Sequence, residues 1–103
     1  MRNTCYIADP ALIERMKKKN MRNIVVEVAS SNTSDFEVSE IFLRLCRDEH
    51  ADYLVEKKRY RRENCDDFCV ILPPYRLEYQ QKVRFYIKKW WIFTHLAYEG
   101  ISF

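Results

Sequence analysis

The sequence predicts a single α+β domain in which helices pack on a small mixed β-sheet. A chain of 103 residues has the size of one domain, and its 48% hydrophobic and 15% aromatic residues supply enough apolar surface for a core. The run Asn23–Ser30 is nearly continuous in β-branched residues, which is typical of a strand covered on both faces. From Arg76 onward, apolar residues recur at helical spacing and predict a long aromatic C-terminal helix.

Two elements are expected before the interior strand. Thr4–Ala8 is a short run suited to an edge strand. Asp9 followed by Pro10 is typical of a helix start, with the aspartate as N-cap and the proline at the first helical position. The helix is predicted to run from Pro10 to about Asn20, and its apolar face comprises Leu12, Ile13 and Met16.

A second helix is predicted after a polar loop at residues 30–34. Ser34-Asp35-Phe36-Glu37 matches a capping box, in which the hydroxyl and the carboxylate each satisfy a free backbone N–H at the helix start. Apolar residues then follow at helical spacing, namely Val38, Ile41, Phe42, Leu45 and Cys46.

Residues 52–62 fit either a helix or a strand. The segment contains good helix formers, but Tyr53 and Val55 also alternate with Leu54 and Glu56. The strand is favoured because Phe68–Leu72 is a compact apolar strand candidate and residues 63–67 between them suit a loop. The sequence therefore predicts a β-hairpin with a basic tip.

The last element is predicted to be a helix between Pro73-Pro74, which stop the preceding strand, and Gly100. Gly100 is the only glycine of the chain and lies where a left-handed C-cap is expected. Two strands are the alternative, since residues 83–93 are rich in β-formers. The helix is favoured because no turn residue divides the segment and Lys88-Lys89 would make a poor hairpin turn.

A second apolar stripe on this helix predicts a homodimer. Phe85, Ile92 and Leu96 fall on nearly the opposite side from Trp90, so a second layer must cover them. A two-fold contact between copies is one cover, and the N-terminal strand and helix of the same chain are the other. The segment is too short to span a membrane, because Lys88 and Lys89 interrupt it.

Charge is segregated along the chain beyond its net value of +3. Residues 15–22 and residues 57–62 each carry five basic residues and no acid, whereas residues 35–56 carry seven acids against two arginines. Such runs suit phosphate contacts, and a tyrosine within them can stack on a base. The predicted nucleic-acid site comprises Lys57, Lys58, Arg59, Tyr60, Arg61 and Arg62, together with Lys17, Lys18 and Lys19. Lysines at a helix end also favour the helix dipole, and basic residues also protect an exposed strand edge.

No enzymatic site and no cofactor are predicted. His50 and His95 have no nucleophile motif around them, and a single glycine excludes a glycine-rich phosphate cradle. Two Cys/His pairs have plausible zinc-ligand character, Cys46 with His50 and Cys65 with Cys69. Their spacing is not that of a zinc knuckle, so free thiols buried as small apolar groups are favoured and no metal is predicted.

A protein-interaction module is the alternative function. In that case the partner is another protein, the basic residues serve solubility, and the acidic helix from Asp35 to Asp48 presents Glu37, Glu40 and Arg44.

Seven Tyr, dense Lys/Arg/Glu, one Gly and four Cys make the chain similar in composition to the small orphan proteins of filamentous and rod-shaped viruses of hyperthermophilic archaea. The resemblance carries no motif and transfers no functional residue. It implies a viral protein acting on nucleic acid or on host machinery. In a hyperthermophile, intracellular disulfides are the alternative to free thiols. Residues 1–10 lack the apolar segment of a signal peptide, so we expect an intracellular protein, in the host cytoplasm if viral.

Overall fold

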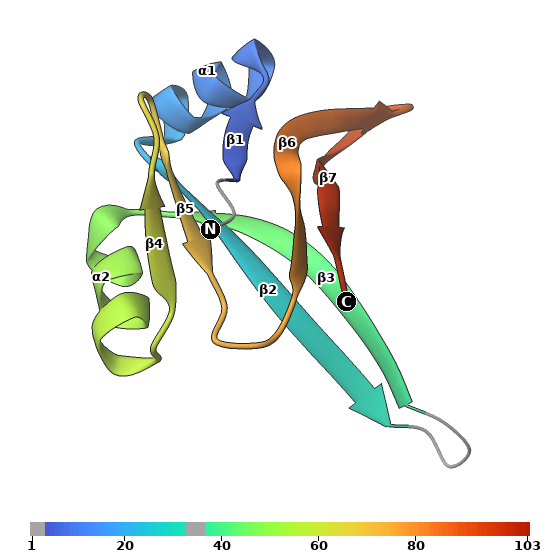
Figure 1. The fold of residues 1–103 in the computed structure, drawn as a ribbon. Helices are drawn as coiled ribbons and strands as arrows, with labels where there is room; N and C mark the ends of the chain where they lie inside the picture. Colours follow the sequence, from blue (N-terminus) through green and yellow to red (C-terminus); the bar gives the residue numbers. More distant parts are fainter. Residues whose placement is uncertain (1–3, 33–36) are drawn as a thin grey trace.

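The computed structural model describes residues 4–32 and 37–103, which form seven strands and two short helices (Figure 1). In chain order these are β1 (Cys5–Ala8), α1 (Pro10–Lys19), β2 (Asn23–Asn32), β3 (Glu37–Cys46), α2 (Asp48–Lys57), β4 (Arg61–Asn64), β5 (Cys69–Leu72), β6 (Glu78–Trp90) and β7 (Phe93–Ser102). The predicted α+β class is confirmed, whereas the predicted long C-terminal helix is wrong.

The strands form two mixed sheets. The large sheet has the order β3-β2-β5-β4, with β2 antiparallel to β3 and parallel to β5, and β4 antiparallel to β5. The small sheet has the order β1-β6-β7, with β1 parallel to β6 and β6 antiparallel to β7. Cys5 pairs with Lys82, so the first strand of the chain joins a strand close to its other end.

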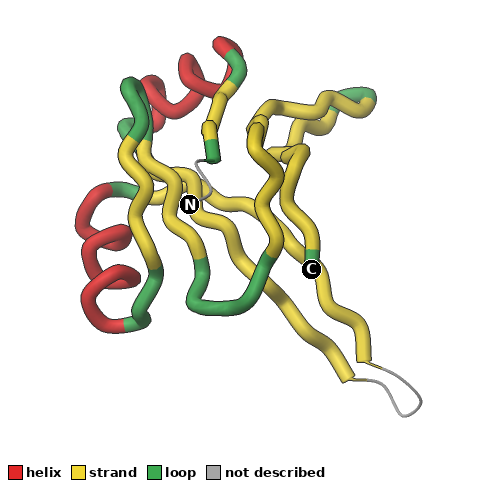
Figure 2. Tube along the Cα trace, in the orientation of Figure 1, coloured by secondary structure: helices red, strands yellow, loops and turns green. Residues whose placement is uncertain are grey.

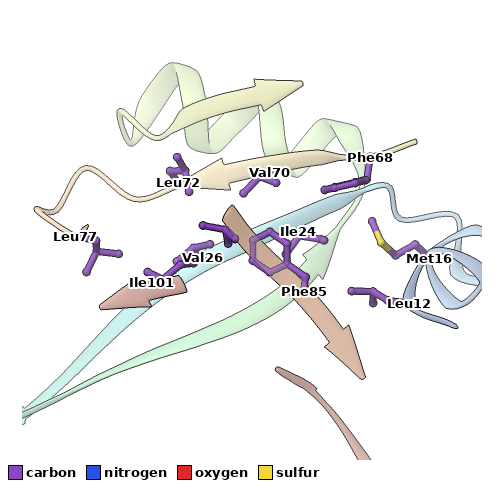
Figure 3. Close-up of a cluster of buried hydrophobic side chains, with 11 residues drawn as sticks. Leu12, Met16, Ile24, Val26, Phe68, Val70, Leu72, Leu77, Phe85 and Ile101 are labelled. Carbon is purple, nitrogen blue, oxygen red and sulfur yellow. The ribbon is translucent and has the colours of Figure 1, made fainter. Parts of the chain in front are cut away.

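The large sheet is covered on both faces. Ile24 and Val26 of β2 pack against Phe85 of β6 in the main core, which lies between the large sheet on one side and the small sheet with α1 on the other (Figure 3). Val25 points to the opposite face, where it packs with Leu54 of α2 in a second, smaller core. The layers are therefore α2, the large sheet, and the small sheet together with α1.

The predictions for the first three elements are confirmed. β1 is a short edge strand, and α1 begins at Pro10 with Asp9 as an extended N-cap residue. Leu12 and Met16 of α1 are buried in the main core. β2 is an interior strand, flanked by β3 and β5, which explains why its apolar run is nearly continuous.

The helix predicted from Asp35 to Asp48 is wrong, because residues 37–46 form β3 and pair with β2 along the whole of that strand. Ile41, Leu43 and Leu45 pack against the main core, and the residues between them face the other side of the sheet. This alternation has the period of a strand. Most of the predicted capping box, Ser34–Phe36, lies outside the described residues.

The helix predicted from residue 76 to residue 99 is also wrong. β6 and β7 form an antiparallel hairpin closed by the two residues Trp91 and Ile92, and helix is confined to α1 and α2 in the part of the chain described (Figure 2). Trp91 has a φ of 55°, the left-handed value that the first loop residue of a tight hairpin turn takes. Gly100 has a φ of 93°, but it lies inside β7 and caps no helix.

The prediction for residues 52–62 is partly right. The segment begins as helix α2, the alternative structure, and only its end enters strand β4. The predicted pairing with Phe68–Leu72 is confirmed, since β4 pairs with β5 from Arg61↔Leu72 to Asn64↔Cys69.

Candidate functional site

The predicted basic segment, residues 57–62, connects α2 to β4 and is not the tip of a hairpin. Lys57 ends α2, Lys58 follows as its C-cap, and Arg59 turns the chain with a φ of 62°. The hairpin of β4 and β5 turns at the other end of β4, after Asn64. The basic residues therefore do not alternate across the two faces of one ribbon as the strand prediction required.

Half of this segment is occupied by interactions within the protein. Arg61 lies 3.3 Å from Glu63, and Arg62 lies 2.5 Å from Asp52. The Tyr60 hydroxyl donates a hydrogen bond to Glu27, a half-buried carboxylate of β2. Burial, and then this hydrogen bond, raise the pKa of the Tyr60 hydroxyl. Tyr60 therefore ties the connection to the large sheet, and its ring is not an open stacking surface.

The three lysines at the end of α1, predicted as part of the nucleic-acid site, are exposed and divide between two sides of the helix. Lys17 borders a hollow together with Arg22, Arg47 and Asp48. Lys18 and Lys19 face the far end of the β6–β7 hairpin across a groove of about 550 Å³. Lys18 also lies 3.5 Å from Glu14, one helical turn earlier.

The β6–β7 hairpin ends in a run of four exposed apolar residues, named here the hairpin tip. The exposed fractions are 68% for Trp90, 78% for Trp91, 75% for Ile92 and 60% for Phe93. Scattered single apolar residues are normal on a protein surface, whereas four consecutive large ones on a projecting hairpin form a contiguous apolar patch, and such patches are typical of contact surfaces. The tip projects away from the body of the molecule and from the α2–β4 connection (Figure 1).

The outer face of the hairpin alternates aromatic and basic side chains toward the tip. Trp90 is directly opposite Phe93, and Lys88 is directly opposite His95, one step back. Residues opposite each other in a hairpin project from the same face, so the two rings lie on this face with Lys88 and His95 behind them. All four side chains are exposed.

Further from the tip on the outer face, Arg84 connects the hairpin to the start of α1. Its guanidinium lies 4.5 Å from the ring of Tyr86 and donates to both carboxylate oxygens of Asp9, at 2.9 and 2.6 Å. This bidentate pair lowers the pKa of the Asp9 carboxyl, chiefly through the hydrogen bond. Asp9 is also the N-cap residue of α1, so the pair fixes the start of α1 against the hairpin.

The inner face of the hairpin forms the groove with α1. Lys89 and Thr94 are opposite each other on this face, and Arg15 of α1 donates a hydrogen bond of 3.0 Å to the Thr94 hydroxyl. The groove is bordered by four basic side chains and one carboxylate, namely Arg15, Lys18, Lys19, Lys89 and Glu14. This groove lies on the opposite face of the hairpin from Trp90 and Phe93, so basic residues border the hairpin tip on both faces.

The three residues predicted as a dimer interface do not share a surface. Phe85 is fully buried in the main core, Leu96 is half-buried against it, and Ile92 lies in the exposed hairpin turn. They align on a helix but not on a hairpin, where Phe85 and Leu96 face inward. The stripe that suggested a two-fold contact is thus absent, and a homodimer stays a prediction without that basis.

The acidic partner surface is likewise rearranged, because Glu40 and Arg44 lie on strand β3 and not on a helix. The Arg44 Nε atom lies 3.0 Å from Glu27, so its charge is already paired. The side chain of Glu37 lies outside those that the structure describes.

The two Cys/His pairs do not converge. Cys46 and Cys69 are buried, whereas His50 is exposed on α2 and stacks on Tyr53. Burial raises the pKa of the half-buried Cys65 thiol to about 11, which keeps it protonated. Among residues 4–32 and 37–103, no three His, Cys, Asp or Glu side chains are placed to hold a metal ion.

Comparison with known proteins identifies no relative: no protein-family model, no curated protein and no solved structure matches this chain. Neither α1 nor α2, the helices of the described residues, is long and apolar enough to cross a membrane. The functional conclusion must therefore come from the surface itself.

Proposed function

We propose that this protein binds nucleic acid without catalysing a reaction, and that the binding surface is the β6–β7 hairpin together with the facing side of α1. The observation that carries the proposal is the exposed aromatic tip bordered by basic residues on both faces of the hairpin. Cations contact phosphates and release counterions, while indole and phenyl rings stack on bases of any sequence.

The proposal moves the binding surface away from residues 57–62. In that segment Arg61 and Arg62 are paired with carboxylates and Tyr60 is bonded to Glu27, whereas the aromatic rings of the tip are open to solvent. Exposed ion pairs are weak, so this segment still contributes positive potential. Its own ring, Tyr60, is held by Glu27 and is not free to add stacking affinity beyond charge.

Two charge-reversal variants test the location. One carries Lys19→Glu, Lys88→Glu and Lys89→Glu at the proposed surface; the other carries Lys57→Glu, Lys58→Glu and Arg59→Glu. Each lowers the formal net charge of +3 by six, to −3, so any difference between them reports position and not total charge.

Fluorescence anisotropy with labelled oligonucleotides at several salt concentrations is the measurement. The proposed surface carries five cations, namely Arg15, Lys18, Lys19, Lys88 and Lys89. If each contacts one phosphate of a single strand, the logarithm of the association constant should fall with the logarithm of the salt concentration with a slope of about −3.5, from about 0.7 per contact. We expect the hairpin variant to lose binding and the 57–62 variant to retain most of it. The reverse pattern would return the site to residues 57–62, and a wild-type protein that binds no nucleic acid at low salt would refute the proposal.

A further inference from the structure

From the shape of the hairpin tip we infer that the nucleic acid is single-stranded and that its bases stack on Trp90, Trp91 and Phe93. This inference rests on the proposed function and specifies its substrate. The alternatives are a base-paired duplex, in which the bases are already stacked on each other, and an anionic lipid surface, which also attracts aromatic and basic residues.

The number and placement of the rings favour unpaired bases. Trp90 and Phe93 lie on the outer face, and Trp91 occupies the turn next to them. A duplex accepts one or two apolar side chains between base steps at the cost of unstacking, whereas an unpaired strand presents every base to a ring. Three exposed rings within four residues therefore favour an unpaired strand, which can place a base on each ring, over a duplex.

The basic residues also favour a strand over a membrane. A lipid surface is approached by a tip whose cations surround it at one depth. Here Lys88 and Lys89 point to opposite faces of β6, and Lys18 and Lys19 lie back from the tip across the groove. Cations on both faces of the hairpin suit a phosphate backbone that passes around the tip while its bases stack on the rings.

The backbone at Trp91 gives a further reason to assign a role to the tip. Its φ of 55° is a value that glycine or asparagine adopts readily, and a bulky residue there is strained. With 78% of the side chain exposed, burial offsets little of that strain. A contact with an unpaired base supplies a reason for an indole at a position where folding favours glycine.

The chain offers a direct measurement, because its two tryptophans, Trp90 and Trp91, are both in the tip. Intrinsic tryptophan fluorescence therefore reports on this surface alone. We expect oligo(dT) to quench the emission on binding, because stacking brings the indoles against bases. The same titration uses a duplex of matched length and vesicles of phosphatidylcholine with phosphatidylserine.

Single substitutions add the energetic test. Trp91→Ala and Phe93→Ala should each weaken oligo(dT) binding by about 5-fold to 150-fold, which is the measured range for one stacked base. Trp91→Phe keeps a ring and should recover most of the affinity, and Trp90 still reports the titration. Because these side chains lie outside the core, circular dichroism should be unchanged; Ser39→Ala, on the exposed part of β3, serves as a control that alters neither property.

The outcomes separate the two proposals. Equal or tighter binding to the duplex, or binding without change in tryptophan emission, overturns the single-strand assignment and leaves nucleic-acid binding standing. A blue-shifted, enhanced emission with the vesicles and none of these effects with oligo(dT) assigns the tip to lipid and overturns both. Loss of affinity in the alanine variants, with recovery in Trp91→Phe, supports stacking.

Discussion

Replacing Gly100 by alanine should destabilise the protein more than any change at the hairpin tip. Gly100 lies in β7 opposite an irregularity of β6, where the register moves from Tyr79↔Ile101 to Arg84↔Glu99. Residues 80–83 of β6 therefore face one residue of β7. A Cβ atom at Gly100 would lie 2.5 Å from the backbone oxygen of Lys82 and 3.3 Å from the Cα atom of Val83.

Two terms contribute to the expected cost. A positive φ costs an alanine about 1–2 kcal/mol relative to its ordinary conformations, and Gly100 has a φ of 93°. The contact with Lys82 is with backbone, so the bulge must move, and Val83 beside it is fully buried. Overpacking of this kind costs about 1–3 kcal/mol. The sum, about 2–5 kcal/mol, is a large part of the roughly 5–15 kcal/mol by which a domain of this size is stable.

Urea denaturation followed by circular dichroism measures the effect, with Ser102→Ala on the same strand as the control for a harmless change. Gly100→Asn separates the two terms, because asparagine tolerates positive φ but carries the same Cβ atom. If the conformational term dominates, asparagine recovers stability; if the steric term dominates, it is as destabilising as alanine. A loss below about 0.5 kcal/mol for Gly100→Ala, the size of an ordinary surface change, would refute the close approach to β6.

Three further predictions concern the turn, one ion pair and one hydrogen bond. Trp91→Gly should raise the free energy of unfolding by up to about 1 kcal/mol, since glycine adopts the left-handed conformation freely, while weakening oligo(dT) binding; a less stable variant would contradict the turn geometry. Because Arg84 lowers the pKa of Asp9 in the folded protein, this pair stabilises the fold above the pKa that Asp9 has in the unfolded chain. That stability is lost as pH falls through the folded pKa. The Asp9→Asn variant should therefore lose less stability than the wild type over this pH range in acid unfolding curves. Because the pKa of Tyr60 is raised in the folded protein, its contribution is complete below about pH 10 and is lost as pH rises further. Tyr60→Phe should therefore lose about 1–2 kcal/mol at neutral pH by removing the hydrogen bond to Glu27, and should show a smaller alkaline decrease; an unchanged alkaline curve would speak against that bond.

The fold was predictable where one local signal dominates. Asp9-Pro10 sets the start of α1, and the β-branched residues of β2 indicate an interior strand. β3 was not predictable in this way, because Ile41 and Leu45 fit a helical stripe and Ile41, Leu43 and Leu45 also fit a strand face. Pairing with β2 decides between the two, and that contact is invisible in a local pattern.

The hairpin was missed for a related reason. Hairpin turns are recognised by glycine, asparagine or aspartate, and this turn is made by Trp91 and Ile92. The need of Gly100 for a positive φ was predicted correctly, although for a helix cap and not for a bulge. With the helix rejected, the run from Trp90 to Phe93 changes from part of a buried stripe to the tip of a hairpin. A site prediction based on runs of basic residues therefore could not identify the aromatic hairpin tip.

The pairing of β1 with β6 has a consequence for the order of folding during synthesis. Cys5 and Lys82 are 77 residues apart in the chain, so β1 has no strand to join until most of the protein has left the ribosome. Until then Leu12 and Met16 of α1 cannot pack against Phe85, which belongs to the same core, and they remain exposed to other nascent chains. The β6–β7 hairpin is thus the segment that closes the core as well as the one that carries the aromatic tip. A chain truncated before β6 should therefore accumulate as an aggregation-prone intermediate and not as a smaller native domain.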